Sequence, residues 1–311
     1  MSVIFESLVP IFLLVACGVW LKRVRFIAPT LWEGLEQLGY YILFPALLFS
    51  TLATAQFSGL KTDATALATI GGVLAMSGLV LALWPLLAKR GVPASTFTSL
   101  FQTATRWNGF MALAAAERLY GATGLTLTAL VMTLIIVPIN FVNIGVLIWF
   151  NGGPRSLSFF ALRILSNPMV AASLVGIALN LAGITVYAPV MSAVRMLAES
   201  SLPLGLIMVG AGLRLADLVR PKPLVFLSSL LKLIVMPVFM VGFGAALGLS
   251  GDALLTIALG ASVPTAMNGY LLAKQMGGDA PFYAVAATLQ MVASFLTIPL
   301  VLSAAAYFAA G

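Results

Sequence analysis

Residues 264–275 read PTAMNGYLLAKQ, and they interrupt a stretch of chain that is otherwise apolar enough to lie within a lipid bilayer. The segment combines Pro264 and Thr265 with an Asn268-Gly269 pair, and proline and glycine are the residues that most weaken a helix. A helix in lipid satisfies its backbone polar groups internally, so a break is tolerated only where the freed groups face other protein or a cavity. The segment therefore predicts a membrane protein with a helix interrupted at an internal site.

The composition of the whole chain also indicates a protein that lies in the lipid bilayer. Of its 311 residues, 61% are hydrophobic and 8% are charged, whereas a soluble domain is about a quarter charged. Cys17 is the single cysteine, which excludes an intramolecular disulfide, and the lack of histidine excludes histidine metal sites and proton relays. The net charge of +7 comes mainly from short loops beside apolar runs, which is typical of membrane topology rather than of nucleic-acid binding.

Apolar runs long enough to cross a hydrocarbon core of about 30 Å follow one another along the chain. They predict an all-α integral membrane protein with ten transmembrane helices and no soluble domain. We expect the first run to be a retained helix, because it lacks the small-residue pattern of a signal-peptide cleavage site. The ten predicted spans are residues 3–21, 31–55, 64–88, 94–119, 122–149, 159–183, 188–213, 222–249, 252–276 and 280–309.

Lysine and arginine residues set the predicted orientation, because cytoplasmic loops carry an excess of them. The side of the odd-numbered loops holds Lys22, Arg23, Arg25, Lys89, Arg90, Arg155, Arg214, Arg220, Lys222 and Lys274. The opposite side holds Lys61, Arg118 and Arg195. The odd-numbered loops are therefore predicted to be cytoplasmic, with both termini outside the cell.

The same landmarks occur twice along the chain. Asn108-Gly109-Phe110 in span 4 recurs as Asn268-Gly269-Tyr270 in span 9, 160 residues later. Five spans is an odd number, so a second copy of five would be inserted upside down, as in many secondary transporters. The sequence therefore predicts two inverted five-helix repeats, residues 1–155 and 156–311. The other matches, 158 to 161 residues apart, are Pro10 with Pro168, Gly18 with Gly176, Pro45 with Pro203 and Pro138 with Pro299.

The paired breaks in spans 4 and 9 are the predicted crossing point and substrate site, since discontinuous helices hold the substrate near the midplane in this plan. Pro45 and Pro203 would shape helices that line the site. The simpler alternatives are a plain kink at each proline and helix-to-helix hydrogen bonding by the asparagines. The candidate substrate-binding residues are Gln102, Arg106, Asn108, Gly109, Pro264, Thr265, Asn268 and Gly269.

Charged side chains in the middle of spans are the more specific signal, because each is costly in lipid unless it is paired or hydrated. Arg106, Glu199 and Lys232 are three such residues. In one interpretation Glu199 neutralises one of the two cations, preferably Lys232. In the other, a cation faces an anionic substrate and Glu199 carries a coupling ion. Arg106 is the stronger candidate for the substrate, because its planar fork can grip a carboxylate with two bonds.

Three segments resemble the bacterial, PIN-like branch of the auxin efflux carrier family: NPMVAASLVGIALNLAGI (167–184), LAESSLPLGLIMVGAGL (197–213) and LGASVPTAMNGYLLAKQMGGDA (259–280). LGYYILFPALLFSTLA (38–53) resembles the family's second helix. The resemblance implies a fold like that of bile-acid/sodium symporters, with a panel and a core subdomain drawn from both repeats and with helices 4 and 9 crossing in the core. It also implies organic anion substrates, such as malonate or other dicarboxylates in bacteria, and a place in the inner membrane.

Individual positions match the family pattern at both breaks. Arg106 and Gly109 match the fourth-helix break, and Pro264, Asn268 and Gly269 match the ninth. Two departures concern the fourth helix, because Trp107 separates the arginine from its asparagine and Ala114 stands where many relatives have a proline. We therefore expect the first break to be less sharply unwound than in relatives, or to depend on Asn108 and Gly109 alone.

The sequence therefore predicts a secondary active transporter that moves a small organic anion, a carboxylate, by alternating access. It is not expected to be an enzyme, because no histidine is present and Asp63, Asp217, Asp252 and Asp279 all map to loops or helix ends. The alternative is a channel or an uncoupled facilitator for small polar solutes. No cofactor or metal is expected, and the coupling ion is left open between H⁺ and Na⁺. The expected partners are the anion, the lipid bilayer and a second copy of the chain in a homodimer, with no nucleic acid.

Overall fold

A computed structural model describes residues 2–24, 27–56, 62–151, 167–219, 222–267 and 269–309 of the protein. The long elements in these residues are all helices, as the composition predicts, and none is a strand. In chain order they are α1 (Ser2–Leu21), α2 (Pro29–Leu38), η1 (Gly39–Leu43), α3 (Phe44–Ala53), α4 (Thr62–Ala82), α5 (Trp84–Lys89), α6 (Ala94–Thr105), α7 (Gly109–Asn151), α9 (Pro168–Leu181), α10 (Ala188–Gly212), η2 (Leu215–Val219), α11 (Pro223–Leu230), η3 (Leu231–Val235), α12 (Met236–Ala246), α13 (Gly251–Ser262), α14 (Gly269–Gln275) and α15 (Ala280–Ala309).

Seven helical stretches among the described residues are long and apolar enough to cross a membrane. One of them, Ala94–Asn151, contains predicted spans 4 and 5 together. Predicted spans 6 and 9 correspond instead to two shorter apolar helices, Pro168–Leu181 and Gly251–Ser262. Residues 159–166, where span 6 was predicted to begin, lie outside the described residues. The protein is thus a helical, multi-pass membrane protein, while the number of ten spans stays a prediction. The seven stretches are Ile4–Leu21, Thr30–Ala53, Asp63–Lys89, Ala94–Asn151, Ala188–Gly212, Pro223–Ala246 and Ala280–Ala309.

The long helix α7 changes direction at Gly121. This residue has φ 60° and ψ −151°, a conformation that is essentially restricted to glycine. The helical stretch Ala94–Asn151 is therefore divided at the place where the sequence predicts the boundary between spans 4 and 5.

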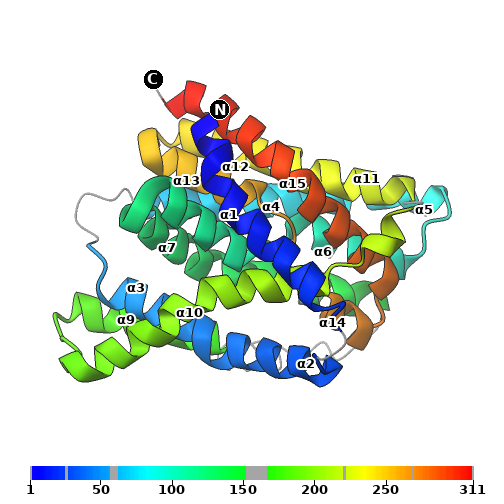
Figure 1. Ribbon diagram of the computed structural model, residues 1–311. Coiled ribbons are helices and arrows are strands. Elements are labelled where there is room, and N and C mark those ends of the chain that lie inside the picture. Colours follow the sequence, from blue (N-terminus) through cyan, green and yellow to red (C-terminus); the bar gives the residue numbers. More distant parts are fainter. Residues whose placement is uncertain are drawn as a thin grey trace.

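The helices form two groups, and each group draws on both halves of the chain (Figure 1). We call the first group the panel; it contains α1, α2 to α3, α9 and α10. We call the second group the core; it contains α4 to α7 and α11 to α15. In Figure 1 the panel helices α2, α3, α9 and α10 form the lower layer, and α1 crosses in front of the core.

Glycines let the panel helices pack backbone against backbone. A Cβ atom at Gly18 of α1 would overlap the carbonyl oxygen of Ile207 on α10. A Cβ atom at Gly176 of α9 would lie 2.9 Å from the carbonyl oxygen of Phe49 on α3. Small residues are the usual means of such close approach between membrane helices. Each contact joins a helix from the first half of the chain to one from the second half.

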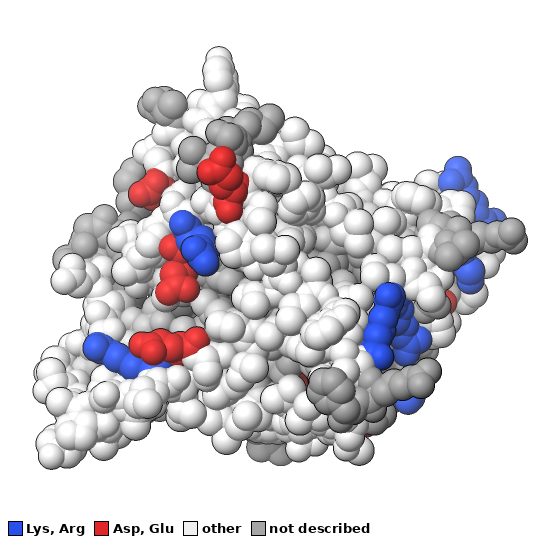
Figure 2. Space-filling model, in the orientation of Figure 1, with Lys and Arg blue, Asp and Glu red and all other residues white. Residues whose placement is uncertain are grey.

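Charged side chains are distributed unevenly over the surface. Figure 2 shows lysine and arginine where α5 and the C-terminal end of α1 lie, and it shows most of the acidic side chains of this view toward the other end, with further lysine or arginine side chains among them. The exposed residues Lys22, Arg23, Lys89 and Arg90 belong to the basic end. The first helix begins and the last helix ends close together, away from this basic end (Figure 1).

Candidate functional site

Both predicted helix breaks are present, and they touch each other. Residues 106–108 separate α6 from α7, and residues 263–267 lie outside the helices between α13 and α14. The backbone N–H of Asn108 donates to the carbonyl oxygen of Pro264 at 2.9 Å. In the described residues the first break is the shorter one. Asn268, a predicted substrate contact, lies outside the described residues.

Local sequence explains why the helices stop at these positions. Pro264 has no N–H to donate, and Val263 before it is extended, with φ −68° and ψ 152°. Arg106 is also extended, with φ −73° and ψ 152°. Asn108 then starts α7 as an N-cap, because its Oδ1 accepts from the backbone N–H of Met111 at 3.1 Å.

Arg106 is buried at the first break, with 7% of its surface exposed. Its Nε donates to Oε1 of Gln102 at 3.2 Å, and its Nη2 donates to Oδ1 of Asn140 at 3.3 Å. Both partners are neutral amides, and no carboxylate among the described residues forms an ion pair with it. A guanidinium has five N–H donors, so most of its donor capacity is left over.

Buried nitrogen atoms without a hydrogen-bond partner are concentrated at the same place. In the part of the chain that the structure describes, the three such side-chain nitrogens are Nε2 of Gln102, Nε1 of Trp107 and Nδ2 of Asn108, and the other unpartnered atoms are hydroxyl oxygens. The amide orientations are fixed, because Oε1 of Gln102 faces an arginine and Oδ1 of Asn108 faces a backbone N–H. The unpartnered atoms are therefore donors.

The second break is occupied by internal contacts. The backbone N–H of Thr265 donates to Oε1 of Gln290 at 2.9 Å, and Oγ1 of Thr265 lies 3.1 Å from the hydroxyl of Tyr283. That hydroxyl also donates to the carbonyl oxygen of Ala266 at 2.5 Å. A Cβ atom at Gly269 would overlap Tyr283. These contacts make Thr265 and Gly269 part of the packing at the crossing, and their role as substrate contacts stays a prediction.

The predicted pairing of Lys232 with Glu199 is wrong. Lys232 is fully buried in the core, where its Nζ donates to the carbonyl oxygen of Ala261 at 2.7 Å and lies 5.2 Å from the centre of the Trp107 ring. Glu199 is exposed on α10 of the panel. The sequence places both residues in mid-span, but it does not show that the two side chains belong to different helix groups.

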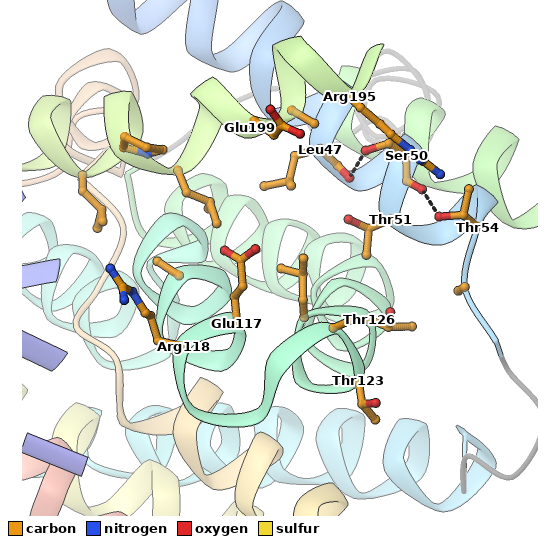
Figure 3. A pocket seen from close by; sticks show the side chains of 18 of the residues that line it. Leu47, Ser50, Thr51, Thr54, Glu117, Arg118, Thr123, Thr126, Arg195 and Glu199 are labelled. Atoms are coloured by element: carbon orange, nitrogen blue, oxygen red, sulfur yellow. Dashed lines mark hydrogen bonds between the residues drawn. The ribbon is translucent and has the colours of Figure 1, made fainter. Parts of the chain in front are cut away.

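Glu199 instead lines a cavity of about 740 Å³ between the panel and the core. Glu199 and Arg195 come from α10, and Glu117 and Arg118 come from α7 on the opposite wall. Figure 3 shows Glu117 and Glu199 pointing into the cavity from these two walls. The remaining lining residues are Pro10, Ile11, Leu14, Leu47, Ser50, Thr51, Thr54, Ala55, Gln56, Ala114, Ala122, Thr123, Leu125, Thr126, Ala198, Leu202, Pro203 and Leu206.

The two prolines predicted to shape the site have different positions. Pro203 lines the cavity from within α10. Pro45 is buried in the first turn of α3 and follows a π-helical turn, Gly39–Leu43. Its neighbour Phe44 contacts Phe110 of the core, and the predicted role of Pro45 in shaping the site stays a prediction.

A phenylalanine of the core fills the space between the cavity and the first break. The Phe110 ring packs edge-to-face on Phe44 at 4.6 Å between ring centres. It lies so close to Gly205 that a Cβ atom there would overlap the ring. Ala114 is at the cavity wall one turn further along α7, and Arg106 is four residues before Phe110. The cavity therefore approaches the break from the side that Phe110 occupies.

Sequence reasoning missed several polar residues that build this region. Asn140, Gln290 and Tyr283 supply partners to the two breaks, and Glu117 lines the cavity. The available signal was a polar side chain in an otherwise apolar span, which holds for Asn140 and Gln290. Their partners lie on other helices and could not be read from the pattern.

The fold and the site together indicate a class of membrane protein. Broken helices that cross inside a helical membrane protein, next to a polar cavity between two helix groups, are features of membrane transport proteins. Residues 154–302 match the family described as "Membrane transport protein", the domain of the auxin efflux carrier family. The family's domain is therefore found in this stretch, which is just under half of the chain, while the bacterial, PIN-like branch stays a prediction. No curated protein matches the chain.

Proposed function

We propose that the protein is a secondary active transporter that binds a small organic anion, a carboxylate, at the crossing of the two broken helices. The observation that carries this proposal is the set of three side chains with buried, unpartnered N–H donors beside a buried arginine that, within the residues described, has no acidic partner. A buried polar group without a partner costs about 1–3 kcal/mol. A ligand that only accepts hydrogen bonds and carries negative charge would relieve this cost at each donor that it reaches.

The chemistry of the donors also argues for a carboxylate. A guanidinium and a carboxylate form parallel N–H···O bonds with geometric specificity. The N-terminus of α7 begins at Gly109 directly after the break, and a helix N-terminus favours a negative group. Gln102 and Asn108 add neutral donors that suit a second oxygen atom or a second carboxylate of the same molecule.

We further propose ten membrane crossings arranged as two inverted repeats. The seven long stretches give this number when Ala94–Asn151 is divided at Gly121 and when α9 and the α13–α14 pair are counted as one crossing each. The panel contacts support the repeat. Gly18 packs on Ile207 and Gly176 packs on Phe49. Gly18 is 158 residues before Gly176, and Phe49 is 158 residues before Ile207, so the two contacts are equivalent in the two halves.

We propose that this conformer is open to the outside of the cell. The cavity lining includes Thr54, Gln56 and Ala122, at connections that follow even-numbered spans. The exposed residues Lys22, Arg23, Lys89 and Arg90 follow or end α1 and α5 at the other end (Figure 1), and an excess of lysine and arginine marks the cytoplasmic side. Alternating access would then move the core, with the crossing point and Phe110, against the panel.

A ligand screen on the purified protein tests the proposal. Thermal unfolding is recorded with malonate, succinate and acetate, and with malonamide as a neutral match for malonate. We expect carboxylates to raise the Tm and malonamide to leave it unchanged. Equal responses to malonate and malonamide would refute an anion site. Counterflow in proteoliposomes then separates a carrier from a channel, because a channel does not exchange labelled for unlabelled substrate against a gradient.

A further inference from the structure

Lys232 is a buried cation that is not part of the proposed substrate site. It lies in a π-helical turn, Leu231–Val235, between α11 and α12, and none of its surface is exposed. Its one hydrogen-bond partner among the described residues is the carbonyl oxygen of Ala261, at 2.7 Å. A buried ammonium is costly unless it is well paired, so this contact requires an explanation.

The carbonyl that Lys232 binds has lost its helical partner because of the break. Ala261 lies in the last turn of α13, and in a continuous helix its oxygen would accept from the N–H of Thr265. That N–H donates instead to Oε1 of Gln290 at 2.9 Å. The C-terminal end of a half-helix carries partial negative charge and free carbonyl oxygens. Lys232 therefore places a positive charge where the backbone offers negative charge.

The first break closes the other side of this cation pocket. The Trp107 ring lies 5.2 Å from Nζ, within the range of a cation–π contact. A Cβ atom at Gly260 would lie 2.5 Å from the same ring, so the indole is held tightly against the end of α13. The ammonium thus contacts both breaks, one through a carbonyl and one through an aromatic face.

In secondary transporters with broken helices, carbonyls at half-helix ends are the ligands of the coupling Na⁺. We propose that the ammonium of Lys232 permanently occupies this position at the end of α13, so that the protein binds its substrate without Na⁺. The inference rests on the proposed transport function. The contacts from which it is argued are those of the protein without substrate. The sequence leaves H⁺ and Na⁺ open as coupling ions, and this proposal excludes Na⁺.

The test compares the wild type with Lys232→Ala and Lys232→Gln in the absence of substrate. Thermal unfolding is recorded in NaCl, LiCl, KCl and N-methyl-D-glucamine chloride at constant ionic strength. The wild type is expected to have the same Tm in all four salts. Lys232→Ala is expected to unfold at a lower temperature and to gain a response to Na⁺ or Li⁺. At a concentration about 100 times the Kd, the gain would be about 5 °C. Lys89→Ala, at an exposed lysine, is the matched control and should behave like the wild type.

Each outcome decides the proposal. Stabilisation of the wild type by Na⁺ over K⁺ would overturn it, as would a folded Lys232→Ala protein that responds to none of the cations. If neither variant can be purified, the wild-type salt series still decides. Failure of the transport proposal has a different signature, because there the carboxylates leave the Tm unchanged while the response to salts is unaffected.

Discussion

Replacing Arg106 by glutamine is the sharpest test of the substrate site. The guanidinium uses two of its five donors, on Gln102 and Asn140, and no acid among the described residues neutralises it. Glutamine can keep an amide contact to Gln102 or Asn140, but it removes the charge and the parallel pair of donors. The substitution should therefore weaken ligand binding more than it disturbs the packing of α6.

The expected magnitude follows from the bonds that are lost. A hydrogen bond to a charged group contributes about 1.5–3 kcal/mol. Loss of two such bonds from a bidentate carboxylate amounts to about 3–6 kcal/mol, which raises the Kd about 10²- to 10⁴-fold at 1.4 kcal/mol for each factor of ten. Arg106→Lys keeps the charge but loses the planar fork, so we expect a loss of about 10- to 100-fold.

The stability of the free protein should change in the opposite direction. Burial of an unpaired cation opposes folding, so the Tm of unliganded Arg106→Gln is expected to equal or exceed that of the wild type. The assay is titration of the most stabilising carboxylate from the screen, followed by thermal unfolding and by calorimetry. Arg90→Gln, at an exposed arginine, is the matched control. If Arg106→Gln binds the carboxylate within about threefold of wild type, the arginine is structural and the assigned site is wrong.

Three further predictions concern the break, the panel and the topology. Asn108→Ala should weaken carboxylate binding at least about tenfold and cost about 1 kcal/mol of stability, because it removes a donor and an N-cap. The control is Asn180→Ala, which removes donors to panel carbonyls. It should lower the Tm without weakening binding. Gly18→Ala should lower the free energy of unfolding by about 1–3 kcal/mol through overlap with α10, while Gly34→Ala, with no atom within 4 Å of its Cβ position, should not; equal Tm values for the two would contradict the packing argument. Cysteine-labelling tags at the two chain termini should both react from outside the cell, and labelling of only one would exclude an even number of crossings.

Backbone-level features were the predictable part of this protein. Proline, glycine and asparagine act on the residues beside them, so breaks near Asn108 and Pro264 could be identified without knowledge of any neighbouring helix. The apolar runs likewise depend only on the local sequence. Gly121 shows the limit of this rule, because the boundary was predicted correctly but the single residue that makes the turn was not singled out.

The partners of buried charges were the part that could not be predicted. Lys232 and Glu199 have opposite charges and similar depths in their spans, which made an ion pair the economical interpretation. Their actual neighbours depend on which helices pack together, and α10 belongs to the panel whereas η3 belongs to the core. The position of the cavity is unpredictable for the same reason, since it is the space left between two groups of helices that each combine distant segments.

The glycine contacts of the panel have a consequence for how the protein is made. Gly18 needs α10 and Gly176 needs α3, so each contact spans the two halves of the chain. A ribosome that has delivered α1 and α3 to the membrane has not yet synthesised either partner, and these two helices remain in contact with lipid until α9 and α10 arrive. The panel can therefore close only after about residue 212 has been inserted, and a chain truncated before α10 is expected to enter the membrane but to be recognised there as an orphan and degraded.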